Sequence, residues 1–522
     1  MPDSSSQRPS IDLQTLFTLA SGIREPNSQN IWRATSSVVK GDKRTPGPQL
    51  LDALAALAVC KAKGQVVAVG VTITQGLVTL HVAENCPVSE NVINHLKDTV
   101  RRIKEIRSFA LRLPRSPPDV QDSALSEKLD DMEDRMIEYA WPKLRQRFRK
   151  RYDGFNKLLR DVVYEDGNVH AEADRSNPPN NHTLALRQRL VEGLRNSDAR
   201  KNLIKFAEAL DIMDAALRDV VTPTKEDSAM VNIAMQLLEV SYGKRVVDER
   251  GQDVLNLCTL YLDRSSYDLA RWINKLITPH RNFSCVSRLV TSTSLAPFID
   301  PTVEVVAVHP QPPVSISVNI TLDTIRQAAQ ESGWKKDEEK NGEGKSIGDH
   351  VLEQVFVDLP QNLRLPKQDV PPQQIQPKYE SVYPHCECTL LASLHGQAGL
   401  YAYFGVSKLS CALCGECFAA YRAVMKLEIH TRGSHSQLVA PWVCPKFSEK
   451  NVEVQEKMKE SILQKISNGL EALQSAEKAR KKSQSSVASD DSYVQRAIKL
   501  PRLAATMLRV EQVMKAREQF GV

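Results

Sequence analysis

Two stretches near the carboxyl-terminal end decide how this sequence folds: HCECTLLASLHG, which begins at His385, and YAYFGVSKLSCALCGECFAAY, which begins at Tyr401. The first stretch predicts a helix that opens at Pro384, because proline suits the first helical turn, where an N–H group has no intrahelical partner. The second predicts a strand at 400–406, a short turn, and a helix that starts near Cys411. The expected order is therefore helix, strand, helix.

The two cysteines at the start of the second helix have the spacing of metal ligands. Cys411 and Cys414 are three positions apart, so in a first helical turn both sulfurs lie on one face. A helix N-terminus also favours thiolate over thiol, and thiolate is the form that binds a metal. A nitrogen of His385 would complete three protein ligands and leave a fourth position for water. That arrangement is typical of catalytic rather than structural zinc sites.

Glu387 lies two residues beyond His385, so it can lie beside the metal without binding it. From there its carboxylate could take a proton from zinc-bound water and pass it to a departing amine. A different interpretation is a structural zinc site, closed by further thiolates from Cys386, Cys388 or Cys417. A third is a set of buried cysteines that bind no metal.

These residues resemble the cytidine-deaminase-like zinc superfamily, whose signature is H-x-E, then a strand, then C-x-x-C at the start of the next helix. The matching pieces are His385-Cys386-Glu387 and Cys411-Ala412-Leu413-Cys414. The phrases GVSKLSCALC and TRGSHSQLVAPWVCP are most similar to a mainly fungal family of predicted nucleic-acid deaminases, related to deaminase domains of bacterial polymorphic toxins. Two positions depart from the superfamily pattern: Ser410 replaces the usual proline, and Cys386 replaces a small residue. Neither departure removes a metal ligand.

The resemblance implies an α/β fold of the three-layer α/β/α type, a mixed sheet flanked by helices, beside a large all-α module. It implies Zn²⁺ as the cofactor and the hydrolytic removal of an amino group from a cytosine or adenine base. The implied partner is a nucleotide or a single-stranded nucleic acid. The alternative is a non-enzymatic helical interaction protein with a structural zinc module, for which Glu387 would be dispensable.

Two residues outside the motifs are candidates for substrate binding. In related deaminases the core starts with a β-hairpin, and an asparagine after its second strand touches the substrate sugar. Asn85 follows a hairpin predicted at 66–73 and 77–84, where runs rich in Val, Ile and Thr flank a Thr-Gln-Gly turn. On this interpretation Asn85 shares a pocket with Glu387, whereas the alternative is an ordinary turn asparagine. His435 could line the mouth of the pocket or belong to a surface loop.

Three further patterns carry weaker signals. A second H-x-E, His170-Ala171-Glu172, is followed by ADRSNPPNN, which offers no apolar helix face, so we interpret it as a solvated loop. The basic run at 145–151 has Phe148 within it and Tyr152 after it, and could bind phosphate and stack on bases or form a solvated helix face. KARKK at 478–482 is a phosphate or nuclear-import patch of low specificity.

Helical spacing of apolar residues predicts helices through most of the remaining chain. They are expected at 48–63, 89–112, 124–164, 184–221, 226–243, 251–278, 448–482 and 493–518. Two strands are expected around a proline-rich turn at 303–320, and an extended Pro/Gln-rich connector at 365–379. The resulting division of the chain is a polar N-terminal segment (1–47), a helix with the hairpin (48–88), a helical module (89–296), strands with the connector (297–379), the deaminase motifs (380–447), and C-terminal helices with a basic, Ser-rich linker (448–522).

The bulk composition excludes little. A chain of 522 residues predicts roughly two to four domains, and its net charge of +6, from 69 basic and 63 acidic residues, permits a nucleic-acid partner without requiring one. The opening MPDSSSQRPS has no apolar core of a signal peptide, and no run of 18 apolar residues occurs. We therefore expect no membrane partner, an intracellular location in the cytoplasm or nucleus, and ten cysteines without disulfides. The oligomeric state is not predicted.

Overall fold

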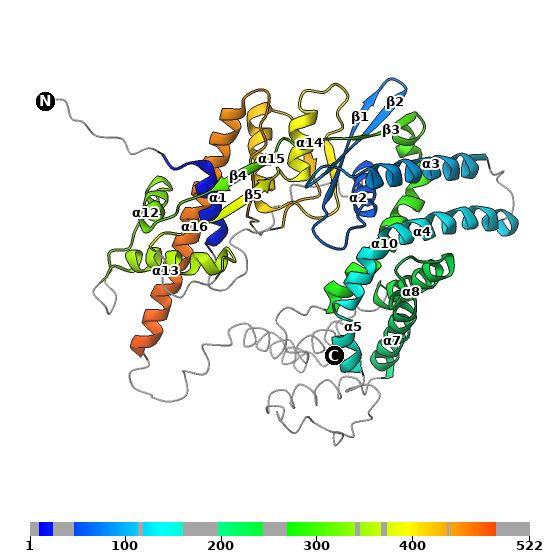
Figure 1. Cartoon of the computed structure of the whole chain (residues 1–522), viewed down its shortest axis with the longest axis horizontal. Helices are drawn as coiled ribbons and strands as arrows, with labels where there is room; N and C mark the ends of the chain where they lie inside the picture. Colours follow the sequence, from blue (N-terminus) through cyan, green and yellow to red (C-terminus); the bar gives the residue numbers. More distant parts are fainter. Residues whose placement is uncertain are drawn as a thin grey trace, which may run out of the picture. The chain divides into compact units, whose positions relative to one another are not determined.

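The computed structural model describes most of the chain and divides it into two compact units, which are treated separately below (Figure 1). The described residues are 10–23, 46–112, 118–159, 197–243, 269–339, 345–366, 373–435, 438 and 440–486. The first unit contains Met1–Ser37, Gln311–Cys388 and Leu409–Val522, and the second contains Val38–Pro310 and Thr389–Lys408. Within the described ranges no helix has the length and apolar character needed to span a membrane.

The second unit is built around a mixed sheet, and the predicted hairpin is confirmed. β1 (Val67–Thr74) and β2 (Leu77–Glu84) pair antiparallel around a turn in which Gly76 has φ +79°. β3 (Thr302–Ala307) runs parallel to β2, and β6 (Tyr403–Val406) runs antiparallel to β1. The strand order in this unit is therefore β3-β2-β1-β6.

Helices cover this sheet because its strands present β-branched side chains to them. α2 (Pro46–Leu57), α3 (Glu90–Arg112) and the start of α4 (Pro118–Arg149) share one apolar core with β1, β2 and α10 (Leu269–Val290) (Figure 1). A Cβ on Gly405 would lie 2.2 Å from the carbonyl carbon of Leu51. Only glycine therefore allows α2 to approach β6 this closely.

A second apolar cluster in the same unit belongs to the predicted all-α module. It joins α4 to α5 (Tyr152–Leu159), α7 (Ser197–Leu217), α8 (Lys225–Gly243) and α10 around Trp141, Phe148 and Trp272. The helices predicted at 89–112 and 226–243 are confirmed. The predicted end of a helix at 278 is wrong: α10 continues through Pro279 because Val286 and Val290 are buried, and packing outweighs the intrinsic cost of proline. A short connection, η3 (Thr293–Leu295) and α11 (Ala296–Ile299), then leads to β3.

The first unit is mostly helical, with a two-stranded sheet. α1 (Leu13–Gly22), α12 (Leu322–Glu331), α13 (Ile347–Asn362) and α15 (Ala412–Met425) pack against the long α16 (Asn451–Ser486). β4 (Val314–Ser317) pairs with β5 (Lys378–Val382), and β7 (His430–Thr431) follows α15. The two strands predicted at 303–320 are confirmed, but they belong to different sheets and do not form a hairpin.

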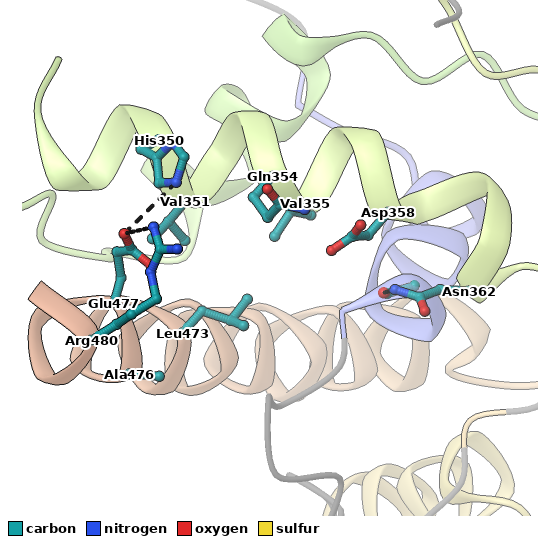
Figure 2. A pocket seen from close by; sticks show the side chains of 11 residues that line it. His350, Val351, Gln354, Val355, Asp358, Asn362, Leu473, Ala476, Glu477 and Arg480 are labelled. Atoms are coloured by element: carbon teal, nitrogen blue, oxygen red, sulfur yellow. Dashed lines mark hydrogen bonds and ion pairs between the residues drawn. The ribbon is translucent and has the colours of Figure 1, made fainter. Parts of the chain in front are cut away.

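α12 and α13 were not predicted from the sequence. The N-terminus of α12 is closed by a capping box between Thr321 and Thr324, in place of the commoner Glu or Gln partner, and α13 contains Pro360. Between α13 and α16 lies a groove of about 390 Å³ with Val355 and Leu473 among its walls (Figure 2). At one end Glu477 bonds Arg480 at 2.8 Å and faces His350 (Figure 2). None of the predicted site residues lines this groove.

Candidate metal centre

Two helix N-termini supply the residues that the sequence singled out. α14 (Cys386–Leu394) begins directly after His385, two residues later than predicted, and Glu387 lies in its first turn. Cys411 is the N-cap residue of α15, and its sulfur accepts a hydrogen bond from the backbone N–H of Cys414. The predicted strand between the helices is β6, and the predicted order of helix, strand and helix is confirmed.

The ligand atoms of His385, Cys411 and Cys414 converge. His385 Nδ1 lies 3.2 Å from Cys414 Sγ and 3.5 Å from Cys411 Sγ, and the two sulfurs are 3.3 Å apart. Zinc bonds of tetrahedral geometry, about 2.3 Å to sulfur and about 2.0 Å to nitrogen, place ligand atoms about 3.5–3.8 Å apart. The donor set and its spacing therefore fit a metal ion, and these three residues could hold one.

The electrostatics of the group are those of a site that exchanges protons for a cation. Burial and the neighbouring Cys414 raise the pKa of the Cys411 thiol, while contact with His385 opposes that rise. Burial disfavours the charged His385 ring, but the Cys411 sulfur and the Glu387 carboxylate together raise the pKa of His385 to about 9. Protons therefore occupy the group in the metal-free protein, and a divalent cation would displace them.

Glu387 lies beside this group without belonging to it. Its side chain is buried, with 4% exposed, and Oε2 accepts a hydrogen bond from Cys386 Sγ at 3.3 Å. Within the described part of the chain, the group of close ligand atoms contains His385, Cys411 and Cys414 and leaves Glu387 out. A buried carboxylate with so weak a donor is costly for folding, which is typical of a functional group.

The additional cysteines do not complete a closed four-ligand site. Cys386, Cys388 and Cys417 are all buried, yet none joins the group of close ligand atoms in the described residues. Cys444 Sγ contacts Met458 Sδ at 3.9 Å on α16. Three protein ligands and an adjacent buried carboxylate favour a catalytic over a structural metal site.

Trp442 is a site residue that sequence reasoning missed. Its indole Nε1 donates a hydrogen bond to Cys414 Sγ at 3.2 Å, and its ring packs edge-on against Phe17. Because the indole N–H can only donate, the Cys414 sulfur is the acceptor, and the bond helps to orient this candidate metal ligand. The single available signal was its place in APWVCP, within the stretch that carried the family resemblance.

We predict that Trp442→Phe weakens zinc binding about 10–100-fold, the usual effect of losing a hydrogen bond to a metal ligand. Competition with a zinc chelator would measure the affinity. Trp334→Phe is the matched control, because the indole N–H of Trp334 is buried without a partner among the described residues. Equal zinc affinity in the two variants would show that the bond to Cys414 has no part in metal binding.

Asn85 and His435, the two residues predicted to bind substrate, both take part in hydrogen bonds with the backbone. Asn85 Oδ1 accepts from the N–H of Val66 at 3.2 Å, and Nδ2 donates to the carbonyl of Gly64 at 2.9 Å, so its amide closes the loop before β1. The N–H of His435 donates to the Ser410 carbonyl at 2.9 Å, beside the start of α15. Substrate contacts by Asn85 and His435 stay predictions. His170-Ala171-Glu172 lies outside the described residues.

The loop geometry predicts a stability effect for Asn85→Ala. Loss of the two hydrogen bonds should lower the free energy of unfolding by about 1–2 kcal/mol. Urea unfolding followed by circular dichroism would measure this free energy. The KM of the same variant for the nucleotide that the protein deaminates would be measured alongside. Unchanged stability combined with a raised KM would favour the substrate role over the loop role.

Comparison with known proteins finds a family model that matches the part of the chain that contains this centre. Residues 384–446 match the model of a family described as OTT_1508-like deaminase (OTT_1508_deam). The matched range contains His385, Glu387, Cys411, Cys414 and Trp442, and it supports a deaminase domain in this part of the chain. No curated protein and no solved structure matches the chain.

Proposed function

We propose that the chain is a zinc-dependent hydrolytic deaminase that acts on a cytosine or adenine base in a nucleotide or nucleic acid. The observation that carries this proposal is Glu387, which is buried beside three close metal-type ligands without being one of them. A structural metal site needs no such carboxylate. The deaminase family match over 384–446 supports the same conclusion independently of the geometry.

Each residue of the centre would have a separate role in the reaction. His385, Cys411 and Cys414 would hold the zinc, which when bound lowers the pKa of water and polarises it for attack on a ring carbon. Glu387 would accept the proton of that water, hold it on its carboxylate, and release it to the departing amino group. Cys386 donates to Glu387 Oε2 and so orients the carboxylate for this transfer.

A screen for product is the direct test of this function. The full chain, purified with zinc, would be incubated with cytosine- and adenine-containing nucleosides, nucleotides and single-stranded oligonucleotides. Ammonia release, and conversion of the amino group to a carbonyl by mass spectrometry, are expected for at least one substrate. The non-enzymatic alternative requires that no substrate is converted and that replacement of Glu387 changes nothing.

A further inference from the structure

Lys143 is a half-buried lysine on α4, and its ammonium has no counter-ion among the residues that the structure describes. Among the described residues it makes no hydrogen bond and no ion pair, and it is not exposed. An ammonium without an ion-pair partner is unfavourable at such a site, because its desolvation is offset only in part by the attraction of the Cys60 sulfur. An unpaired group of this kind in a stable fold indicates a ligand of opposite charge.

Two more cations lie with Lys143. Arg147 is one helical turn further along α4, on the same face, and Lys408 follows β6. The Tyr139 hydroxyl on α4 donates to the Ala58 carbonyl at 3.3 Å, which anchors α4 to the end of α2. Residue 407 is bonded to the start of β1, because the Val67 N–H donates to Ser407 Oγ at 2.9 Å. The Cys60 N–H donates to Gln65 Oε1 at 2.9 Å, which connects the end of α2 to the start of β1. The positive charges of Arg147 and Lys408 both act on Lys143, so the three cations lie near one another.

The electrostatics of this cation cluster, defined as Lys143, Arg147 and Lys408, are repulsive. Burial, with the positive charges of Arg147 and Lys408, lowers the pKa of Lys143 to about 7. Burial lowers the pKa of Arg147 to about 10. Arg147 Nη1 donates to the Lys275 carbonyl at 2.8 Å, and a guanidinium has five donors in total. The Lys408 side chain is exposed, so the cluster is open to solvent on one side.

The aromatic residues beside the cluster narrow the kind of ligand. Phe148 and Tyr152 are 1% and 7% exposed and lie in the apolar core, so they cannot stack on bases as the basic run suggested. The side chain of Arg145 is bonded to the carbonyls of Leu217 and Arg218 at the end of α7. What the surface offers is positive charge and N–H donors, which suit a phosphate group rather than a base.

We propose that Lys143, Arg147 and Lys408 form a phosphate-binding site. In naming that phosphate as part of the deaminase substrate, the inference rests on the proposed function. A nucleotide or an oligonucleotide, the substrate class of the proposed function, carries a phosphate that this cluster could bind.

Binding measurements on an inactive full-length chain test the proposal without relying on turnover. In a Glu387→Ala background, a labelled single-stranded oligonucleotide would be titrated by fluorescence anisotropy at several salt concentrations. Lys143→Met and Lys408→Ala should each weaken binding about tenfold or more, because each removes a charge-assisted bond. Each should also reduce the salt slope by about 0.7 for a lost phosphate contact. Arg149→Ala, an exposed charge on another face of α4, is the matched control and should leave both values near those of the parent.

Competition separates the two sources of phosphate. Displacement of the oligonucleotide by a mononucleotide or by inorganic phosphate, dependent on Lys143, would assign the site to a free phosphate monoester. Displacement only by unlabelled oligonucleotide would assign it to the backbone of a polymer. Both results support a phosphate site, whereas unchanged binding in Lys143→Met and Lys408→Ala overturns it.

A measurement of Tm distinguishes the loss of a phosphate contact from misfolding of the variant. Lys143→Met keeps an unbranched apolar stem and removes the unpaired ammonium, so its Tm should be equal to or above that of the parent. The ligand that displaces the labelled oligonucleotide in the competition should raise the Tm of the parent more than that of the variant. An equal effect of that ligand on the Tm of both proteins would overturn the proposal. If no base is deaminated but Lys143-dependent binding persists, the phosphate site stands and the proposed function fails.

Discussion

Glu387→Gln and Glu387→Ala will retain zinc and lose deamination by about 10²–10⁴-fold, because a positioned proton-transfer group contributes about that factor. Zinc should remain, since His385, Cys411 and Cys414 form the group of close ligand atoms without Glu387. The fold should also survive, because the substitution removes a buried charge and not a large apolar contact. Metal analysis, thermal unfolding and the rate on the substrate found by screening are measured together.

Glu416→Gln is the matched control for this experiment. Glu416 is also on a helix beside the centre, but its carboxylate bonds Lys465 at 2.8 Å and Ser461 at 2.5 Å on α16. Its loss should leave the rate and zinc content unchanged. Loss of zinc from Glu387→Gln would make Glu387 a metal ligand. Full activity in that variant would end its acid–base role and return attention to His170-Ala171-Glu172.

Cys411→Ser is expected to abolish stable zinc binding. The wild type should contain about one zinc per chain, and the variant close to none, because a hydroxyl is a far poorer ligand than a thiolate. Added zinc should raise the Tm of the wild type but not that of Cys411→Ser. Elemental analysis after dialysis and thermal scans with and without zinc measure the two effects.

Cys388→Ser distinguishes the catalytic from the structural interpretation of the same centre. Cys388 is fully buried three residues from His385, yet it is not in the group of close ligand atoms. The Cys388→Ser variant should therefore keep about one zinc per chain, because a three-ligand site does not use this thiol. Zinc loss in Cys388→Ser as well as in Cys411→Ser would instead indicate a closed thiolate site and favour a scaffold over an enzyme.

Sequence patterns predicted the elements whose signals are local. The hairpin follows from alternating β-branched runs around a glycine turn, and the start of α15 follows from the C-x-x-C spacing at Cys411. Patterns failed where packing overrode a local rule, as when α10 continues past Pro279. They also failed where a capping partner was unusual, as at Thr324 in the first turn of α12. The residues of the centre that belong to the H-x-E and C-x-x-C motifs were predictable from their spacing, whereas the contact of Trp442 with Cys414 was not.

What the sequence by itself determined is a set of candidates: the residues that can bind a metal, the carboxylate that we propose moves protons, and the helices and strands that have clear local patterns. Those properties depend on residue type and on spacings of two to four positions. Only the tertiary structure decided that Trp442 donates to Cys414, that β3 pairs with β2, and that Lys143 has no counter-ion in the described residues. The physical reason is that these partners are brought together by packing of segments far apart in the chain, for which no short-range spacing exists.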